Sequence, residues 1–351
     1  MLKKMGLFLA TAAMLISVMG CGNNSSGTSS TGTSNNGATG NATSGEKASY
    51  KIAISQIVEH PSLDATREGF LAALKDGGLV EGDNLTVDYN NAQGDQTNNL
   101  TIAQKIAGEK YDLVLAIATP PAQAVVQQVK NSPILFAAVT DPLDAKLVDN
   151  LEQPGGNVSG AADTNPEAIV KLMDFIAANI KDVKNVGIVL NQGEPNAVVM
   201  SKHAEEALQK HGIKLIKASV TNTSEVKQAA ESLVGRVDAI YITLDNTVVE
   251  AVSTIIQVAN EHDIPFFSAD RDSVEKGAFA TVGFKYYDHG YQAGQMALEV
   301  LKNGKKVGDL KVTFPEKLDL IMNLKAAAEQ GIEVTDAMKD QVIDKENNLL
   351  E

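Results

Sequence analysis

The chain has 351 residues, and its 30 lysines and arginines stand against 44 aspartates and glutamates, giving a formal net charge of −14. A surface with this excess of negative charge repels phosphate backbones and anionic lipid headgroups, which excludes nucleic acid as a partner. Cys21 is the only cysteine, and its place in the N-terminal segment leaves no disulfide, cysteine-based metal site or thiol catalysis for the rest of the chain.

The N-terminal segment has the form of a secretory signal. Two lysines, Lys3 and Lys4, precede an apolar stretch over residues 5–19, which is shorter than the roughly 20 apolar residues that a membrane span needs. The sequence Val18-Met19-Gly20-Cys21 resembles the bacterial lipobox, in which the chain is cut before the cysteine and the thiol is acylated. The alternative is an ordinary signal peptide with an incidental cysteine. We expect a lipoprotein signal peptide over residues 1–20 and lipidation of Cys21.

Residues 21–49 are expected to form a flexible tether. This segment is rich in glycine, serine, asparagine and threonine, so almost none of it can be buried. Roughly 300 residues follow it, which exceeds the size at which a single core stops growing, and two domains are therefore expected. No second apolar run approaches membrane-spanning length. The sequence predicts an extracytoplasmic protein that is attached to the membrane through its lipid anchor only.

After the tether, nine short apolar runs alternate with helical patterns. The runs cover residues 50–57, 84–90, 112–118, 133–139, 185–190, 213–220, 238–244, 264–269 and 278–284. Most are continuously apolar, as is typical of parallel strands covered on both faces. Between the runs, apolar residues recur at helical spacing, for example at Ile169, Leu172, Met173 and Ile176. The alternation predicts an α/β fold with two doubly wound parallel sheets.

A break over residues 152–166, rich in glycine, proline and asparagine, divides the strands into two groups. A helix near 286–303 and the apolar runs at 310–314 and 318–324 are expected to cross back between the groups. The predicted N-terminal lobe comprises residues 50–162 and 286–316, and the predicted C-terminal lobe comprises residues 164–284 and 317–351.

Polar residues follow six of the predicted strands, at the positions where open parallel sheets bind ligands against helix N-termini. They are Gln56, Glu59 and His60 after the first strand, Thr119 and Pro120 after the third, Thr140 and Asp141 after the fourth, Glu194 and Asn196 after the fifth, Asp245 and Asn246 after the seventh, and Asp270 after the eighth. Each residue can serve simply as a helix cap, and Thr119 before Pro120 fits that role well. Six such ends from two lobes would nevertheless meet in one cleft if the lobes close face to face.

The chemistry of these positions favours a zwitterionic ligand. They include several acids and neither lysine nor arginine before Arg271, so a ligand with an ammonium group fits better than a polyanion. Thr119 and the backbone amides at the start of its helix can hold a carboxylate, helped by the helix dipole. An α-amino acid carries both groups.

Enzyme motifs are missing from the sequence. There is no G-x-S-x-G, no G-x-x-x-x-G-K, and no G-x-G-x-x-G after the first strand. The histidines are scattered, and only His60 follows a strand, without a nucleophile that it could activate. We therefore expect a binding protein without a metal or cofactor rather than an enzyme.

The chain resembles the substrate-binding proteins of bacterial ABC importers with the type I periplasmic-binding fold, in the branch associated with tryptophan and tyrosine. The matching stretches are "QIVEHPSLDATREGF" (56–70), "NAQGDQTNN" (91–99), "AIATPPAQAV" (116–125), "AVTDPLDAKLV" (138–148), "PGGNVSG" (154–160), "VTNTSEVKQAAESLVGRVDAIY" (220–241), "DNTVVEA" (245–251) and "VGFKYYDHGYQAGQMA" (282–297). The resemblance implies a monomer with two lobes joined by three crossings, which closes on a small molecule and delivers it to an ABC permease.

The resemblance also implies roles for individual residues. Asp245 would pair with the ligand ammonium, and Thr119 with the amides after it would hold the carboxylate. His60 would lie against the ligand side chain, and further polar contacts would come from Gln56, Asp141, Asn196 and Asn246. The chain has no tryptophan and few aromatic residues, which leaves the choice open between an aromatic amino acid, namely tryptophan, tyrosine or phenylalanine, and a branched aliphatic one. A sensory lipoprotein of the same fold and a binder of sugars or other small solutes are the alternatives.

Overall fold

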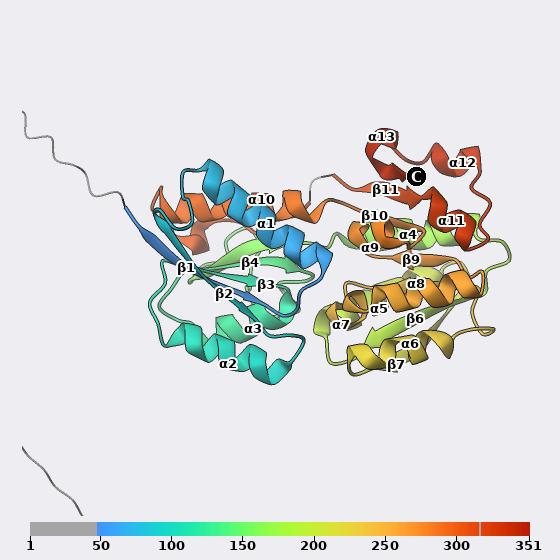
Figure 1. Cartoon of the computed structure of the whole chain (residues 1–351), viewed down its shortest axis with the longest axis horizontal. Coiled ribbons are helices and arrows are strands. Elements are labelled where there is room, and N and C mark those ends of the chain that lie inside the picture. The colour runs from blue at the N-terminus through green and yellow to red at the C-terminus, as the bar shows by residue number, and fades with distance from the viewer. Residues whose placement is uncertain (1–47, 316) are drawn as a thin grey trace, which may run out of the picture. The chain divides into compact units, whose positions relative to one another are not determined.

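The computed structural model describes residues 48–315 and 317–351. The predicted signal peptide, the lipidation site Cys21 and nearly all of the predicted tether lie outside these residues. The described chain contains two sheets (Figure 1). One has five strands in the order β2-β1-β3-β4-β5, and the other has seven in the order β12-β11-β10-β9-β8-β6-β7. The predicted α/β fold with two parallel-sheet lobes is confirmed.

The N-terminal lobe is built on the five-stranded sheet, whose strands all pair in parallel. Its elements are β1 (Tyr50–Gln56), α1 (Pro61–Asp76), β2 (Leu85–Asn91), α2 (Gln96–Ala107), β3 (Leu113–Ile117), α3 (Thr119–Gln128), β4 (Ile134–Val139), β5 (Val158–Ala162), α10 (Tyr286–Leu301) and the 3₁₀ turn η2 (Val307–Asp309). The strands carry the continuous apolar runs seen in the sequence, because helices cover both faces of the sheet. Ile52, Ile54, Leu113 and Leu115 are fully buried at its centre.

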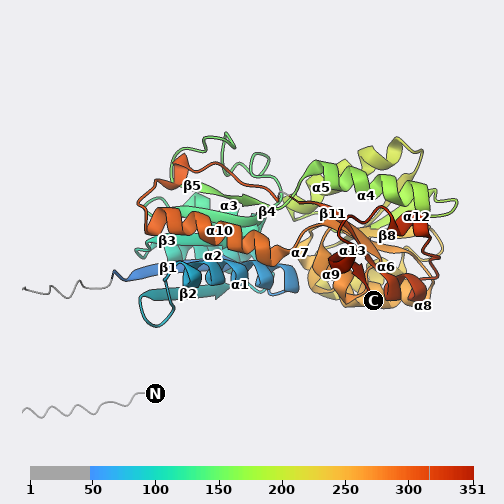
Figure 2. The same cartoon turned by 90° about the horizontal axis from the view of Figure 1, so that it is seen from above.

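The late helix α10 belongs to this lobe because it packs tightly along α1, and the two helices lie side by side in Figures 1 and 2. Glycines make the close approach possible. A Cβ on Gly290 would collide with the backbone carbonyl of Thr66, and one on Gly69 would collide with that of Tyr287. A chain segment more than 200 residues away is thereby fixed against the first helix.

The C-terminal lobe is built on the seven-stranded sheet. Its elements are α4 (Pro166–Asn179), β6 (Asn185–Asn191), α5 (Pro195–Gln209), β7 (Lys214–Val220), η1 (Thr223–Glu225), α6 (Val226–Glu231), β8 (Ala239–Ile242), α7 (Asn246–Glu250), α8 (Val252–Glu261), β9 (Phe266–Ser268), α9 (Arg271–Lys276), β10 (Ala280–Gly283), β11 (Asp319–Asn323), α11 (Leu324–Glu329), α12 (Asp336–Lys339), α13 (Lys345–Asn348) and β12 (Leu349–Leu350). Only the β10–β11 pair is antiparallel among the pairings of the described strands. Phe175, Phe267 and Phe279 pack edge-on or tilted at the centre of this lobe, with ring centroids 5.5 to 6.4 Å apart.

All nine predicted strands are present, and the described residues contain three more, β5, β11 and β12. β5 lies inside the segment that the sequence analysis interpreted as a break, so that interpretation is wrong for residues 158–162. The strand consists of small residues, and its Gly160 lies so close to Phe136 of β4 that a Cβ would collide with the ring. The glycine therefore serves close strand packing here and not a turn.

Three segments connect the lobes: one between β5 and α4, one between β10 and α10, and one between residue 313 and β11. The apolar run at 310–314 lies beside β5 and forms a single bridge, between Ala161 and Thr313. Pro315 follows this run. Proline has no backbone N–H to donate to a neighbouring strand, and it restricts the residue before it to an extended conformation.

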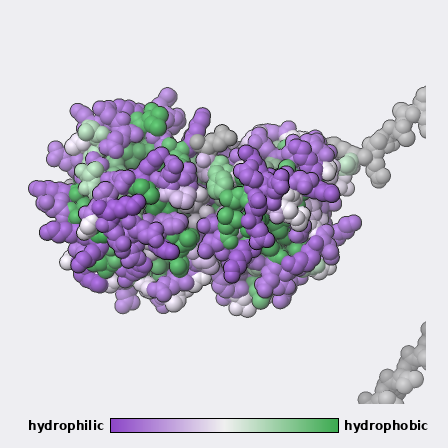
Figure 3. Space-filling model, turned by 180° about the vertical axis from the view of Figure 1, so that it is seen from behind, coloured by the Kyte–Doolittle hydropathy of each residue, from purple (hydrophilic) through white to green (hydrophobic). Residues whose placement is uncertain are grey.

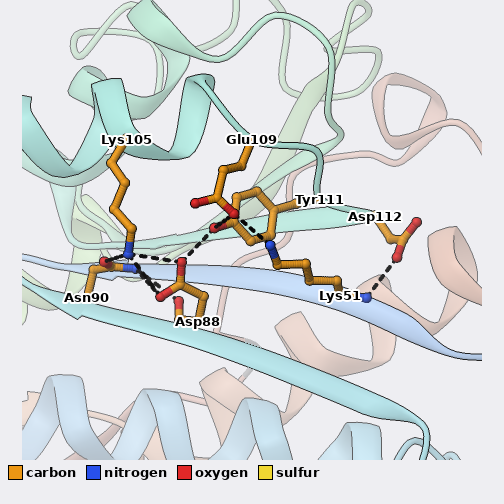
Figure 4. Close-up of polar contacts among 7 residues, drawn as sticks. All are labelled: Lys51, Asp88, Asn90, Lys105, Glu109, Tyr111 and Asp112. Carbon is orange, nitrogen blue, oxygen red and sulfur yellow. Dashed lines mark hydrogen bonds and ion pairs between the residues drawn. The ribbon is translucent and has the colours of Figure 1, made fainter. Parts of the chain in front are cut away.

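The outer edge of the N-terminal lobe carries a polar network that ties β1, β2, α2 and β3 together (Figure 4). The Tyr111 hydroxyl donates to Asp88 at 2.5 Å, and Lys105 contacts the same carboxylate at 3.1 Å. Lys51 pairs with Glu109 at 2.6 Å and lies 4.6 Å from the centroid of the Tyr111 ring. These contacts are structural, because each joins neighbouring elements of one lobe.

No helix among the described residues is long and apolar enough to span a membrane. The face seen in Figure 3 is mostly hydrophilic over both lobes.

Candidate functional site

The turn from β3 into α3 has a strained backbone. Ala118, at the N-cap position, has φ +81° and ψ 161°, a conformation that non-glycine residues rarely adopt. α3 then begins at Thr119 itself, so Thr119 is not the N-cap that the sequence suggested. Its buried hydroxyl has no hydrogen-bond partner among the described residues. A strained turn that buries a free hydroxyl is typical of a binding site.

The same turn corrects the expected carboxylate site. Pro120 and Pro121 follow Thr119 and have no N–H groups, and the amide of Ala122 donates to the Ala118 carbonyl at 3.2 Å. The expected row of free amides is therefore missing from this helix start. What remains there for an anion is the hydroxyl and the amide of Thr119.

Gln56 and Glu59, after β1, are engaged within the N-terminal lobe. The Gln56 amide nitrogen donates to the Val58 carbonyl at 2.8 Å and to Asp64 at 2.9 Å, and its oxygen accepts from Arg67 at 3.0 Å. Glu59 is exposed and accepts from the Tyr89 hydroxyl at 3.1 Å. Both side chains stabilise the loop before α1.

Thr140 and Asp141, after β4, also have local roles. Asp141 Oδ1 accepts from the amides of Leu143 at 3.0 Å and Asp144 at 2.9 Å, as a loop-capping aspartate does. The Thr140 hydroxyl helps to hold the carboxylate of Asp163, which lies in the segment connecting β5 to α4. Among the described residues, neither side chain forms a hydrogen bond to the C-terminal strand ends.

The start of α1 reaches across to the other lobe, at the junction where Figures 1 and 2 place it beside α7. The Ser62 hydroxyl donates to Asp270 Oδ1 at 3.1 Å. His60 precedes the helix without capping it and contacts the side chain of Asn246. Burial lowers the pKa of His60, although the nearby carboxylates of Asp270, Asp64 and Glu194 oppose this shift.

Glu194 is the centre of the polar contacts on the C-terminal side. Its carboxylate accepts from the amide and side chain of Asn246 at 3.0 and 2.6 Å, and from the amide and hydroxyl of Thr247 at 2.9 and 2.8 Å. Asn196 adds a fifth donor at 3.1 Å. The buried charge is therefore held by the N-terminus of α7 and its neighbours.

Asp245 and Asp270 are buried helix caps. Asp245 Oδ1 accepts from the Val248 amide at 3.2 Å and Oδ2 accepts from the Asn191 amide at 2.6 Å. Burial, and then the nearby charge of Glu194, raise the pKa of Asp245. Asp270 accepts from the Ser273 amide at 2.8 Å and from two serine hydroxyls of its own lobe. Capping thus accounts for both residues, as the sequence allowed.

Several buried polar atoms at the facing strand ends have no hydrogen-bond partner among the described residues. They are His60 Nδ1, Thr119 Oγ1, Asn196 Oδ1, Tyr241 Oη and Thr243 Oγ1. Buried polar groups are almost always paired, so a group of unpaired ones indicates a place for a polar ligand or water. Tyr241 and Thr243 were not predicted as site residues because they lie in and just after an apolar strand, and Ser62 was not predicted either. The only signal was a polar side chain at alternate positions of that strand.

Two of the cavities between the lobes lie at the facing strand ends. One of about 400 Å³ is lined by Ile57, Val58, Gly94 and Gln96 on one side and by residues including Glu194, Asn246 and Glu250 on the other. The second, of about 260 Å³, lies between Pro120 on α3 and Gly193 before α5. Neither lining includes a lysine or arginine. Arg271 contacts Asn348 at 2.6 Å in the C-terminal segment instead.

Two parallel-sheet lobes whose strand ends meet across polar cavities, with unpaired buried polar groups on both sides, define a two-lobed solute-binding protein. Residues 51–344 match the family of ABC transporter substrate binding proteins, and the chain belongs to this family. It is a substrate-binding protein of an ABC transporter, a class that acts outside the cytoplasm and not as an enzyme.

Similar proteins include one called a tyrosine-binding protein in Clostridioides difficile, 40% identical over 277 residues that cover 79% of each chain. A Streptococcus ABC domain in complex with L-Trp is 30% identical with a TM-score of 0.79, covering 84% of this chain and 99% of that chain. A ligand-free, open substrate-binding protein from Clostridium difficile is 38% identical with a TM-score of 0.62, covering 86% and 98%.

Proposed function

We propose that the protein binds an aromatic amino acid between its two lobes and delivers it to an ABC permease. The observation that carries the proposal is the group of buried, unpaired polar atoms contributed by both lobes at the facing strand ends. The names of two relatives support the ligand class, since one is a tyrosine-binding protein and the other was solved with L-Trp. Both of those ligands are aromatic α-amino acids.

The comparison of TM-scores supports a closed arrangement of the lobes. The L-Trp complex is less similar in sequence than the open, ligand-free protein, 30% against 38% identity, yet its TM-score is higher, 0.79 against 0.62. Rotation of one lobe against the other lowers such a score without any change within the lobes. The contact between Ser62 and Asp270 fits the same interpretation.

The helix N-termini at the cleft differ in their electrostatics, because some carry an aspartate cap and others have no side-chain cap. α7 and α9 begin with buried aspartate caps, Asp245 and Asp270, whose carboxyl groups lie at the N-termini of these helices. α3 has no side-chain cap, so the positive end of its dipole stays open. A zwitterion is stabilised when its ammonium lies toward α7 and α9 and its carboxylate lies toward the start of α3, near Thr119.

Calorimetry on residues 48–351 tests the proposal. The protein is unfolded and refolded to remove bound ligand and is then titrated with each of the twenty amino acids. We expect binding of tyrosine or tryptophan, and the proposal is wrong if none of the twenty binds.

Thr119→Val then tests the carboxylate contact, because it removes the hydroxyl at nearly constant volume. A hydrogen bond to a charged group is worth about 1.5–3 kcal/mol, so the affinity should fall by roughly 10- to 100-fold. Thr101→Val on the outer face of α2, where the hydroxyl bonds its own helix, is the matched control. Equal affinities of both variants would remove Thr119 from the site.

The membrane anchor is part of the proposal. The protein is held to the outer face of the membrane by lipidated Cys21, and the lipobox-like sequence over residues 18–21 supports this anchor. In the full-length protein, Cys21→Ala is expected to move the chain from the membrane fraction to the soluble fraction, and a variant that stays with the membrane would contradict the anchor.

A further inference from the structure

The orientation of the Asn196 amide is fixed by its neighbours. Its nitrogen donates to the Leu244 carbonyl at 2.6 Å and to the Glu194 carboxylate at 3.1 Å. Both partners can only accept hydrogen bonds, so the amide cannot be flipped. Both N–H groups are used, and the buried oxygen, Oδ1, has no donor among the described residues. Asn196 therefore presents a bare acceptor.

His60, from the other lobe, presents a second acceptor of this kind. The nitrogen of the Asn246 side chain donates to Glu194 at 2.6 Å, and the same amide lies beside the imidazole of His60. Burial lowers the pKa of His60, which favours the neutral ring with one N–H. Nδ1 is buried without a partner among the described residues, and it has a lone pair in the tautomer that carries the proton on Nε2.

The two acceptors lie in one connected group of residues. Asn196 and Asn246 contact the same Glu194 carboxylate, and His60 contacts Asn246 and lies within the field of Glu194. The surrounding carboxylates already have donors. Asp245 takes two backbone amides, and Glu194 takes five donors. The two carboxylates thus have hydrogen-bond donors from the protein, whereas Asn196 Oδ1 and His60 Nδ1 have none among the described residues.

We propose that the ligand ammonium is bound directly by Asn196 Oδ1 and His60 Nδ1, one from each lobe. Asp245 and Glu194 stabilise its positive charge electrostatically, without contacting it. This assignment rests on the proposed function and replaces the direct pairing with Asp245. A single ammonium can satisfy two bare acceptors at once, because it has three N–H donors. Because the acceptors come from different lobes, the ammonium also links the lobes on closure.

Asn196→Ala tests the first acceptor, with tyrosine and its des-amino analogue 3-(4-hydroxyphenyl)propanoate measured by competition. Tyrosine affinity should fall by roughly 10- to 100-fold, whereas the analogue, which has no ammonium, should change less than threefold. Asn179→Ala, at the end of α4, is the matched control because that amide bonds its own helix. Equal losses for the two ligands, or no loss for tyrosine, would overturn the assignment.

The pH profile tests the second acceptor without any substitution. Opening the cleft relieves the burial that lowers the pKa of His60, and protonated Nδ1 donates instead of accepting. Closure must then expel a proton, so tyrosine affinity should fall at least fivefold from pH 7.5 to pH 5. The groups that face the ring are Asp64 on its own helix and Asn246, Glu194 and Asp270 on the other lobe. His60→Gln should bind with less than twofold change over this range, and His211→Gln, on the outer surface, should keep the wild-type profile.

A flat wild-type profile, or an unchanged slope in His60→Gln, would overturn the role of His60. These failures differ from failure of the proposed function. If the wild-type chain binds no amino acid at any pH, the proposed function and the assignment are both wrong, whereas tyrosine binding that ignores Asn196 and His60 overturns only the assignment.

Discussion

Replacing Asp163 by asparagine should stabilise the protein at neutral pH. Asp163 lies in the segment connecting β5 to α4 and is 5% exposed. It accepts from the Tyr286 hydroxyl at 3.0 Å and from the Thr164 hydroxyl at 3.1 Å. Burial raises its pKa from 3.8 to about 6, although these hydrogen bonds lower it. This buried carboxylate, which has no cationic partner among the described residues, thus links the β5–α4 connection to the start of α10, where a second connection ends.

The sign follows from the raised pKa. The folded protein binds the proton more tightly than the unfolded chain, so the stabilisation is complete below pH 3.8 and is lost as the pH rises through about 6. A shift of about 2 units corresponds to about 3 kcal/mol at pH 8. Asparagine is never charged but loses one acceptor, which costs about 1 kcal/mol. The net gain for Asp163→Asn is therefore about 2 kcal/mol at pH 8.

Urea unfolding of residues 48–351 at pH 5 and pH 8 measures this difference. Relative to the wild type, the free energy of unfolding of Asp163→Asn should be higher at pH 8 than at pH 5. The surface control Asp309→Asn should have the wild-type free energy of unfolding at both pH values. A variant that is less stable than the wild type at pH 8, or a difference that does not change with pH, would refute the reasoning.

Two further substitutions separate closure from stability. Ser62→Ala removes the cross-lobe hydrogen bond to Asp270, which keeps three donors in its own lobe. Loss of this bond, worth about 1 kcal/mol, should lower the affinities for tyrosine and tryptophan equally, by roughly fivefold in calorimetry. A lower affinity for only one of the two ligands would contradict a role in closure. Tyr111→Phe removes the 2.5 Å hydrogen bond to Asp88 and should lower the free energy of unfolding by about 1 kcal/mol in urea without changing ligand affinity. Reduced affinity in Tyr111→Phe would show that the outer network reaches the cleft.

The sequence predicted the fold well where burial alone decides the pattern. The continuous apolar runs became the nine central strands, because helices on both faces of each sheet require apolar residues at every position. β5 could not be found in this way. Its residues are small and its Gly160 is needed for contact with Phe136, a partner that only the folded sheet brings near. β12 is two residues long, too short for any periodicity.

The site was predictable by position but not by role. Strand ends pointed to His60, Thr119, Asn196 and Asn246, and the structure places unpaired or cross-lobe polar groups on the first three. The same rule selected Gln56 and Asp141, whose side chains bond only to their own lobe. Which atom of a side chain stays free depends on every neighbour, so periodicity and spacing carry no information about it. In contrast, the sequence alone shows that Pro120 and Pro121, after Thr119, have no backbone N–H groups to offer a carboxylate.

If neutral acceptors bind the ammonium, as proposed, the buried acids need no salt bridge to the ligand. A carboxylate at a helix start is stabilised by amides that the helix cannot otherwise satisfy, and Asp245 and Asp270 both have such amide donors. If one of them also had to pair with the ammonium, opening the lobes would leave it short of a partner. With the charges satisfied by the helices and the contacts made by neutral acceptors, the C-terminal lobe keeps one arrangement in both states. The cost of opening then falls on the few groups that reach across the cleft, at His60 and Ser62.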